Sequence, residues 1–338
     1  MNKEVLHFLS KTVTLRRIYN LFKVIFSYLL SLAIKKPIIF GLPPIVTIEP
    51  TDICNLQCPM CPTGNGTLKR EKGFMSFDLF KKIIDEVYED TMMILLWNQG
   101  EPFLNKELIK MTKYASDKGL YVIVSTNGSI ELNANQIVNS GIDTLIFSID
   151  GITQESYEKY RVKGDLNLVL TNLKNIIAEK KRLRKTLPLI EWQFLVFKHN
   201  ENQIDKVKKL AKKFEVDFLK LKTAQIYSAN DLEYLPENPK YRRYKIKGNN
   251  FKIKFNLKNR CRRIWTQPVV NWNGEMAVCC FDKNNIHKIG NVQNENIKTI
   301  WNGKKYNDFR KIILTDRKSI PMCRNCGEGI KLKFIEKK

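Results

Sequence analysis

Three cysteines lie within eight residues in the stretch CNLQCPMC, directly after the strand-like run IVTI; they are Cys54, Cys58 and Cys61. Three thiolates can bind a cubane iron–sulfur cluster and leave its fourth iron open, whereas four thiolates would close it. The open iron could hold a small ligand, as the open position of a catalytic zinc site does. The alternative is a zinc site with a distant ligand, but the three histidines have no matching spacing to Cys54.

Five further cysteines follow near the C-terminus. The stretch NWNGEMAVC has alternating apolar positions around Asn273-Gly274, which predicts a tight hairpin. A thiol before this hairpin, a thiol on it and the later C-x-x-C turn CRNC can converge on one tetrahedral four-thiolate site. By chemistry alone that site could hold zinc or an iron–sulfur cluster.

Composition narrows the class of protein. The chain has 338 residues, of which 43% are hydrophobic, and this predicts a globular protein with a sizeable core. The first residues lack the features of a signal peptide, so we expect a cytoplasmic protein whose cysteines bind metal rather than form disulfides. The net charge of +24 favours an anionic partner such as nucleic acid, a membrane surface or a phosphorylated substrate, although compositional drift explains it equally well.

Strands and helices alternate through the middle of the chain. Six runs rich in β-branched and aromatic residues predict buried strands at 45–49, 92–97, 121–125, 144–149, 189–197 and 218–223. Helical patterns separate them, one of them with Ser76 as its N-cap. Six β–α units predict a parallel α/β fold, open or barrel-like, with fewer units than the eight of a closed barrel.

Residues 1–40 differ from the rest. From Leu15 to Ile34 a narrow polar stripe recurs every three or four positions on a mostly apolar, cationic helix. Such a helix can lie on an anionic membrane surface, which would make the protein peripheral on the inner face of the membrane. The alternative is a helix docked on the protein's own core. We expect four regions: this segment, a core domain at 41–225, a polar linker at 226–258 and a small cysteine-rich domain at 259–338.

The cysteine spacing, with the motifs that follow it, resembles the signature of radical S-adenosylmethionine (radical SAM) enzymes. Met60 departs from that pattern, because the family usually has an aromatic residue before the last cysteine. NQGEP, after the second predicted strand, is similar to the family motif GGEP, although a turn alone would explain it. The resemblance implies that Gly100 and Glu101 hold the amino group of S-adenosylmethionine (SAM).

Three later motifs extend the resemblance. STNG, with Ser125 and Asn127, resembles the edge that contacts the ribose of SAM. SIDG contains Ser148 and Asp150, and the following Arg161 is similar to the residue that meets the SAM carboxylate, although it could be an ordinary surface charge. At the end of the fifth strand, Val196 or Leu195 could pack on adenine or simply belong to the core. Together these motifs imply a partial (β/α)6 TIM-like barrel with a SAM-binding [4Fe–4S] cluster.

The C-terminal cysteines resemble the auxiliary-cluster region called SPASM, or twitch when shortened. The resemblance implies one auxiliary [4Fe–4S] cluster, because no cysteine follows the C-x-x-C; its ligands would be Cys261, Cys279, Cys323 and Cys326. Cys280 is then left over as a buried hydrophobe, an alternative ligand or a proton-transfer group. Asp282 is a candidate catalytic base, unless it is a solvated turn residue.

The resemblance implies that one electron cleaves SAM to a 5′-deoxyadenosyl radical, which abstracts a hydrogen from the substrate. An auxiliary cluster that accepts an electron favours an oxidoreductase. A reducing protein such as flavodoxin or ferredoxin would supply the electron that cleaves SAM. Its substrate is unidentified, and a membrane- or carbohydrate-linked molecule would suit the basic N-terminal segment. The alternatives are a peptide-modifying maturase and a zinc-stapled nucleic-acid-binding protein. The last lacks a recognition helix, so we expect no nucleic acid as partner.

Overall fold

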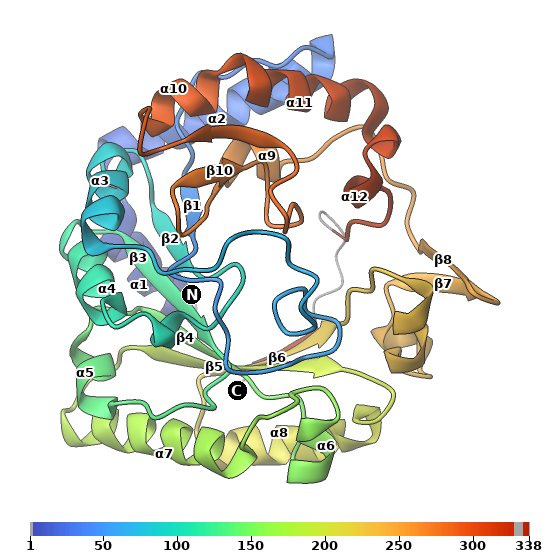
Figure 1. Ribbon diagram of the computed structural model, residues 1–338. Coiled ribbons are helices and arrows are strands. Elements are labelled where there is room, and N and C mark those ends of the chain that lie inside the picture. The colour runs from blue at the N-terminus through green and yellow to red at the C-terminus, as the bar shows by residue number, and fades with distance from the viewer. Residues whose placement is uncertain (1–2, 328–333, 338) are drawn as a thin grey trace. The chain divides into compact units, whose positions relative to one another are not determined.

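The computed structural model describes residues 3–327 and 334–337, and Figure 1 shows the arrangement of its helices and strands. The fold is α/β with the six predicted strands, each within two residues of its expected limits, as a partial (β/α)6 barrel requires. These strands are β1 (Ile45–Ile48), β2 (Met93–Leu96), β3 (Tyr121–Thr126), β4 (Thr144–Ser148), β5 (Leu189–Val196) and β6 (Phe218–Thr223).

Helices follow each of these strands except the last, and their ends carry the expected signals. The Ser76 side chain caps the helix after it by accepting a hydrogen bond from the Leu79 amide, and Gly119, with φ at +71°, follows α4. The helices of this part are α3 (Phe77–Val87), α4 (Leu108–Asp117), α5 (Ala134–Asn139), α6 (Gln154–Glu158), α7 (Leu166–Arg182) and α8 (Ile204–Lys213). Short 3-10 helices lie at Pro102–Leu104, Glu201–Gln203, Ala229–Tyr234, Pro239–Tyr241 and Arg317–Ser319.

The chain divides into two compact units whose limits differ from the expected domains. The first unit is Met1–Ile53, Lys69–Ile123 and Asn256–Gly329, and the second is Cys54–Leu68, Val124–Phe255 and Ile330–Lys338. The division separates the C-terminal cysteines, which lie in the first unit, from the loop of the first three cysteines, which lies in the second. Each unit is described by itself below.

In the first unit the C-terminal region extends the sheet. The predicted hairpin is present: β9 (Val269–Val270) and β10 (Glu275–Ala277) pair antiparallel around Gly274, whose φ is +80°. The parallel pairing of β9 with β1 aligns Val269 with Thr47, and the strand order is β11-β10-β9-β1-β2. The remaining elements of this region are α9 (Arg263–Thr266), β11 (Lys288–Asn291), α10 (Ile297–Asn302), α11 (Lys304–Asp316) and α12 (Pro321–Arg324).

In the second unit the strands β4, β5 and β6 are parallel neighbours in that order. A last strand, β12 (Phe334–Lys337), pairs antiparallel with β6. The predicted linker contains an antiparallel pair, β7 (Tyr244–Lys247) and β8 (Asn250–Ile253), that the sequence reading missed. The sequence signals that could have predicted it are the alternating lysines and the turn pair Gly248-Asn249. Gly248 has a φ of +54° in this turn.

The N-terminal segment forms two helices, α1 (Lys3–Thr12) and α2 (Leu15–Ile34). The polar stripe of α2 faces the protein, because Asn20, Ser27 and Ser31 are buried. The Arg17 guanidinium, which is also buried, donates to the backbone carbonyl oxygens of four residues in the first unit: Tyr88 at 2.7 Å, Gly119 at 2.7 Å, Lys118 at 3.1 Å and Thr12 at 3.3 Å. The polar side of α2 therefore attaches this helix to the first unit.

We expect Arg17→Met to loosen α2, because it removes a charged donor from four carbonyl oxygens, each bond contributing about 1.5–3 kcal/mol. Amide hydrogen exchange should accelerate at least about tenfold across α2, with α7 of the second unit as the internal control. Unchanged exchange in α2 would show that Arg17 does not anchor it.

Candidate active site

The loop with the first three cysteines belongs to the second unit. Two donors point at the Cys54 sulfur, namely the Leu56 amide at 3.4 Å and the Asn127 side-chain amide at 3.8 Å. Hydrogen bonds to cysteine sulfurs are a recurring feature of iron–sulfur sites, where they adjust the reduction potential. The Cys61 amide donates to the Cys58 carbonyl oxygen at 3.1 Å, so the last two thiols sit on one tight turn. None of the eight cysteines forms a disulfide.

Arg161 and Asp150 form a largely buried ion pair in the same unit. The Arg161 Nε donates to one carboxylate oxygen at 2.7 Å, and Nη2 lies 2.6 Å from the same oxygen as an ion pair. The other carboxylate oxygen accepts from the Leu195 amide at 2.6 Å. Burial raises the pKa of the Cys58 thiol, while the nearby Arg161 charge acts in the opposite direction. The structure therefore brings Asp150, Arg161 and Cys58 together.

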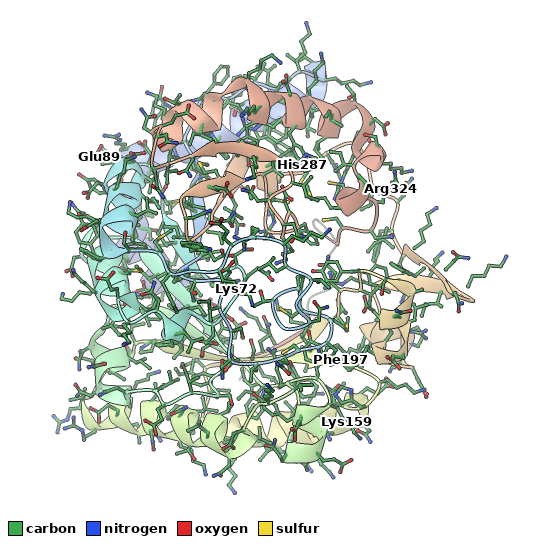
Figure 2. The ribbon with its side chains drawn as sticks, in the orientation of Figure 1. Lys72, Glu89, Lys159, Phe197, His287 and Arg324 are labelled. Atoms are coloured by element: carbon green, nitrogen blue, oxygen red, sulfur yellow. The ribbon has the colours of Figure 1, made fainter. Side chains whose placement is uncertain are left out.

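The other predicted residues of this unit lie at or just beyond the ends of three parallel strands. Asn127 donates to Asn55 on the cysteine loop at 2.9 Å, whereas Ser125 is half-buried and Ser148 is buried. Val196 is fully buried. Beside it, the Phe197 ring, labelled in Figure 2, packs on Tyr160 at a centroid distance of 4.3 Å.

The QGEP motif belongs to the first unit. Gly100 has a φ of +73°, and a Cβ on it would lie 2.4 Å from the Thr51 carbonyl oxygen, so only glycine fits. The Glu101 amide donates at 2.8 Å to the carbonyl oxygen of Ile53, the residue that precedes Cys54. The Glu101 side chain is buried and accepts from the Phe103 amide at 3.2 Å. The motif is thus fixed to the end of the segment that leads into the cysteine loop.

A buried ion pair next to this motif was not predicted from the sequence. Both nitrogens at the end of the Arg70 side chain bind Glu49, each at 2.9 Å, and the two side chains are 7% and 0% exposed. The same carboxylate accepts from the Asn98 side chain at 2.9 Å and the Gln99 amide at 3.1 Å. The sequence signal that could have predicted the pair is Glu49 itself, a charged residue at the end of a predicted buried strand, where a charge needs a partner. Glu49 therefore orients the residues just before Gly100.

Burial makes two of the C-terminal thiols of the first unit weaker acids than an ordinary cysteine. It raises the pKa of Cys323 to about 12 and that of Cys279 well above its ordinary value, with Cys261 and Cys326 adding to both effects. Buried thiols in this state become thiolates only next to a compensating cation, which the irons of a cluster would supply. Among the described residues, no three His, Cys, Asp or Glu side chains are arranged to hold a single metal ion. Cys261 and Cys326 lie near enough to both Cys279 and Cys323 to act on their pKa values, as the ligands of one cluster would.

Cys280 and Asp282 stand beside this set in different environments. Cys280 is half-buried and close enough to Cys279 to raise the pKa of that thiol. Asp282 is buried, and its two carboxylate oxygens accept from the amides of Ile286 at 2.8 Å and His287 at 2.9 Å. These contacts give Asp282 a place in the 282–287 turn, and its role as a base stays a prediction.

Comparison with protein families gives two matches. Residues 48–190 match the model of the radical SAM superfamily, and residues 261–327 match SPASM, an iron–sulfur cluster-binding domain. The chain contains a radical SAM domain and a SPASM domain. Its two domains imply a SAM-binding [4Fe–4S] cluster, an auxiliary cluster and SAM as cofactors, and the cysteines required for them are present. The resemblance predicted from the motifs is confirmed.

Relatives of known activity have different substrates. The chain is 26% identical to the tungsten-containing aldehyde ferredoxin oxidoreductase cofactor-modifying protein of Pyrococcus furiosus, over 83% of this chain and 86% of that protein. It is 31% identical to the AdoMet-dependent heme synthase of Methanosarcina barkeri, over 50% of this chain and 47% of that one. The PqqA peptide cyclase of Bradyrhizobium diazoefficiens is 26% identical over 56% of this chain and 48% of that enzyme.

Solved structures show the same fold. BtrN in complex with AdoMet and 2-DOIA superposes with a TM-score of 0.53 at 18% identity, covering 86% of this chain and 94% of that one. Streptococcus suis SuiB bound to S-adenosylmethionine gives 0.62 at 13% identity, covering 87% of this chain and 74% of that one. The predicted α/β fold with its partial barrel agrees with these radical SAM structures.

Proposed function

We propose that this radical SAM protein is an oxidoreductase that removes a hydrogen atom, and then an electron and a proton, from its substrate. SAM, cleaved with one electron from the reduced cluster, would supply the hydrogen-abstracting species and leave as methionine and 5′-deoxyadenosine. The single observation that carries the proposal is the match of residues 261–327 to a SPASM iron–sulfur domain that contains Cys261, Cys279, Cys323 and Cys326. With all four bound to the auxiliary cluster, that cluster has no open iron for substrate and suits the role of electron acceptor.

The protein's own residues would bind and orient SAM. Cys54, Cys58 and Cys61 would hold the first cluster with one iron open. Gly100 and Glu101 are proposed for the amino group and Arg161, with Ser148, for the carboxylate; Asp150, which touches two guanidinium nitrogens, would fix the direction of that guanidinium. The remaining assignments are Ser125 and Asn127 for the ribose and Val196 for adenine.

A flavodoxin or ferredoxin in the cytoplasm would suit as electron donor. The second candidate function is a peptide-modifying maturase, whose substrate would be a peptide. The similarity to the PqqA peptide cyclase favours this candidate.

Iron and acid-labile sulfide per chain test the cofactor assignment. Protein purified without oxygen should contain about eight of each, because two cubane clusters carry four apiece. About four of each would leave the Cys261 set without a cluster, and the proposed oxidation would lose its electron acceptor. Zinc with no sulfide after reconstitution would contradict both cluster assignments.

A product test separates oxidation from the alternative. With the chemical reductant dithionite, the protein should convert SAM to 5′-deoxyadenosine. For the oxidation proposed here, each substrate molecule should lose two hydrogens per 5′-deoxyadenosine formed, as measured by mass. A cross-link within a peptide substrate would instead establish the maturase.

A further inference from the structure

In a soluble protein an amphipathic helix usually buries its apolar face and exposes its polar face. The helix α2 does the opposite. Its buried side is polar, as described above, while large apolar side chains on the opposite side are exposed. Leu15 is 89% exposed and Phe22 is 62% exposed. Around the helix these residues recur at spacings of three and four, which places them on one stripe: Leu15, Ile18, Tyr19, Phe22, Ile25, Phe26 and Leu29.

The apolar stripe continues beyond the helix itself. The rings of Phe22 and Phe26 stack at 6.1 Å, and Phe26 stacks on Phe40 at the same distance. Phe40 lies on the segment after α2 and is itself half exposed. The result is a continuous aromatic and aliphatic surface, here named the α2 face and defined by the α2 residues above together with Phe40. Exposed apolar surface of this extent marks an interaction site.

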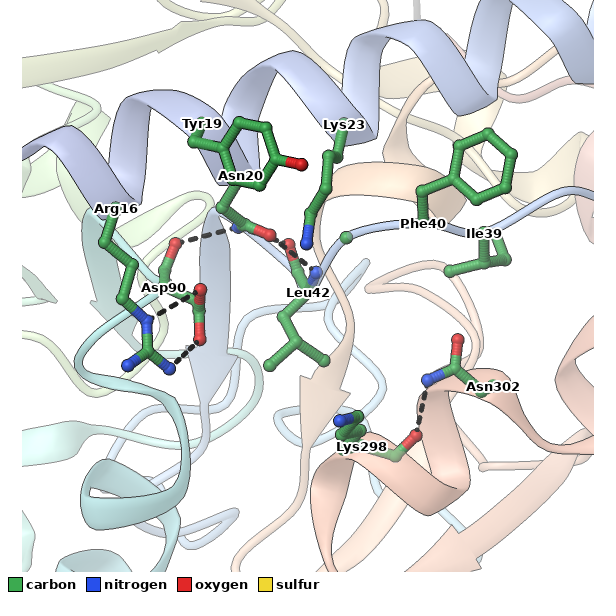
Figure 3. A pocket seen from close by; sticks show the side chains of 11 residues that line it. Arg16, Tyr19, Asn20, Lys23, Ile39, Phe40, Leu42, Asp90, Lys298 and Asn302 are labelled. Carbon is green, nitrogen blue, oxygen red and sulfur yellow. Dashed lines mark hydrogen bonds and ion pairs between the residues drawn. The ribbon is translucent and has the colours of Figure 1, made fainter.

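A cationic pocket of about 480 Å³ adjoins the α2 face (Figure 3). Three cations, Arg16, Lys23 and Lys298, line it together with the carboxylate of Asp90, which Arg16 binds at 2.9 Å. Arg16 also forms an ion pair with Glu89, so three positive and two negative charges leave a net charge of +1 around the pocket. Tyr19 and Phe40 belong to both the pocket and the α2 face, so the charged and apolar surfaces meet without a gap.

We propose that the α2 face docks the protein on an anionic phospholipid surface, with a lipid phosphate in the adjoining pocket. The apolar stripe would enter the boundary between headgroups and acyl chains, and Lys23 and Lys298 would meet the phosphate. This arrangement of an apolar face with cations at its edge is the pattern of interfacial helices. The proposal is independent of the reaction assigned above.

The attachment of α2 to the protein decides how the helix lies. At 20 residues it is long and apolar enough to cross a membrane by length and composition alone. Crossing would require Arg17 and Asn20 to leave the backbone groups they bind and enter hydrocarbon, which is costly for polar groups. The hydrogen bonds therefore favour a helix that lies in the plane of the membrane surface.

Charge also decides against a second copy of the chain as the occupant. Each chain carries a net charge of +24, and a face-to-face pairing would bring two cationic edges together. An anionic lipid surface neutralises those edges instead. The attraction to the lipid should weaken as salt is added, because added ions screen it.

Vesicle co-sedimentation of the full chain with its clusters tests this proposal. The wild-type protein should bind phosphatidylcholine vesicles containing phosphatidylglycerol more tightly than vesicles of phosphatidylcholine alone. The double variant Phe22→Ser/Phe26→Ser should bind at least about tenfold more weakly to both kinds, because two apolar rings would no longer be buried among the lipids. Lys23→Glu/Lys298→Glu should remove only the preference for the anionic vesicles.

A matched control separates this surface from general apolarity. Tyr227→Ser/Ile246→Ser removes two exposed apolar side chains of the second unit, which are 49% and 37% exposed, and should leave vesicle binding unchanged. Unchanged iron content in every variant would show that the fold is kept. Wild-type binding by Phe22→Ser/Phe26→Ser and by Lys23→Glu/Lys298→Glu, or no binding by the wild type itself, would overturn the proposal. A dimer that the Phe22→Ser/Phe26→Ser change dissociates, without vesicle binding, would instead assign the face to a second copy.

Discussion

Alanine in place of Cys58 is expected to abolish the cleavage of SAM and to halve the iron content, from about eight to about four atoms per chain. The reason is that a cluster with an open iron needs all three thiolates of the loop, and Cys58 is the buried one of the three. Both effects are measured on protein prepared without oxygen, by 5′-deoxyadenosine formation with dithionite and by iron analysis.

Two other cysteine variants serve as controls for this result. Cys280→Ala should keep about eight iron atoms, because Cys280 lies outside both predicted ligand sets. Cys323→Ala should lose about four iron atoms but still cleave SAM, because the auxiliary cluster is needed only after hydrogen abstraction. Retained cleavage of SAM by Cys58→Ala would contradict the assignment of the loop cysteines.

Leucine in place of Arg70 should lower the free energy of unfolding by about 3–5 kcal/mol at neutral pH, since it leaves a buried carboxylate without its partner. Glu49 would lose two hydrogen bonds of 2.9 Å. The same carboxylate also accepts hydrogen bonds from the Asn98 side chain and from the amide of Gln99, the first residue of the QGEP motif. We therefore expect a raised KM for SAM in the same variant. Urea unfolding and the dependence of 5′-deoxyadenosine formation on SAM concentration measure the two effects.

The stability deficit of Arg70→Leu should depend on pH. Burial raises the pKa of Glu49, which Arg70 opposes, so the pKa should rise further in the variant. A folded-state pKa above the unfolded one means that the folded chain binds the additional proton, and stability then falls as pH rises between the two values. The deficit should thus be larger at about pH 8 than at about pH 5. A deficit that Glu49→Gln does not reduce in the Arg70→Leu background would contradict this account.

The positions of the six strands and the two cysteine groups could be predicted from the sequence because each depends on local signals. Buried parallel strands such as β5 are nearly continuous apolar runs, and the turn at Asn273-Gly274 has few alternatives in backbone geometry. Thiol spacing likewise limits which side chains can share a cluster. These features need no knowledge of what lies far along the chain.

Contacts between segments far apart in the chain could not be predicted from the sequence. The sequence gives no sign that Arg70 reaches back to Glu49, because a lone arginine in a loop is most often a solvated charge. The direction of α2 was ambiguous for a related reason: periodicity identifies two faces of a helix but not which one meets the protein. The structure shows that the polar face of α2 meets the protein, because Arg17 donates hydrogen bonds to backbone carbonyl oxygens outside the helix.

The pairing of β9 with β1 has a consequence for how the chain is made. Val269 lies 222 positions after its partner Thr47 (269 minus 47), so during synthesis β1 emerges long before the strand that completes its hydrogen bonding. Until then one border of β1 is unsatisfied, and unpaired strand borders recruit other chains. A ribosome-bound or prematurely terminated chain that stops short of β9 would consequently depend on chaperones to stay unaggregated.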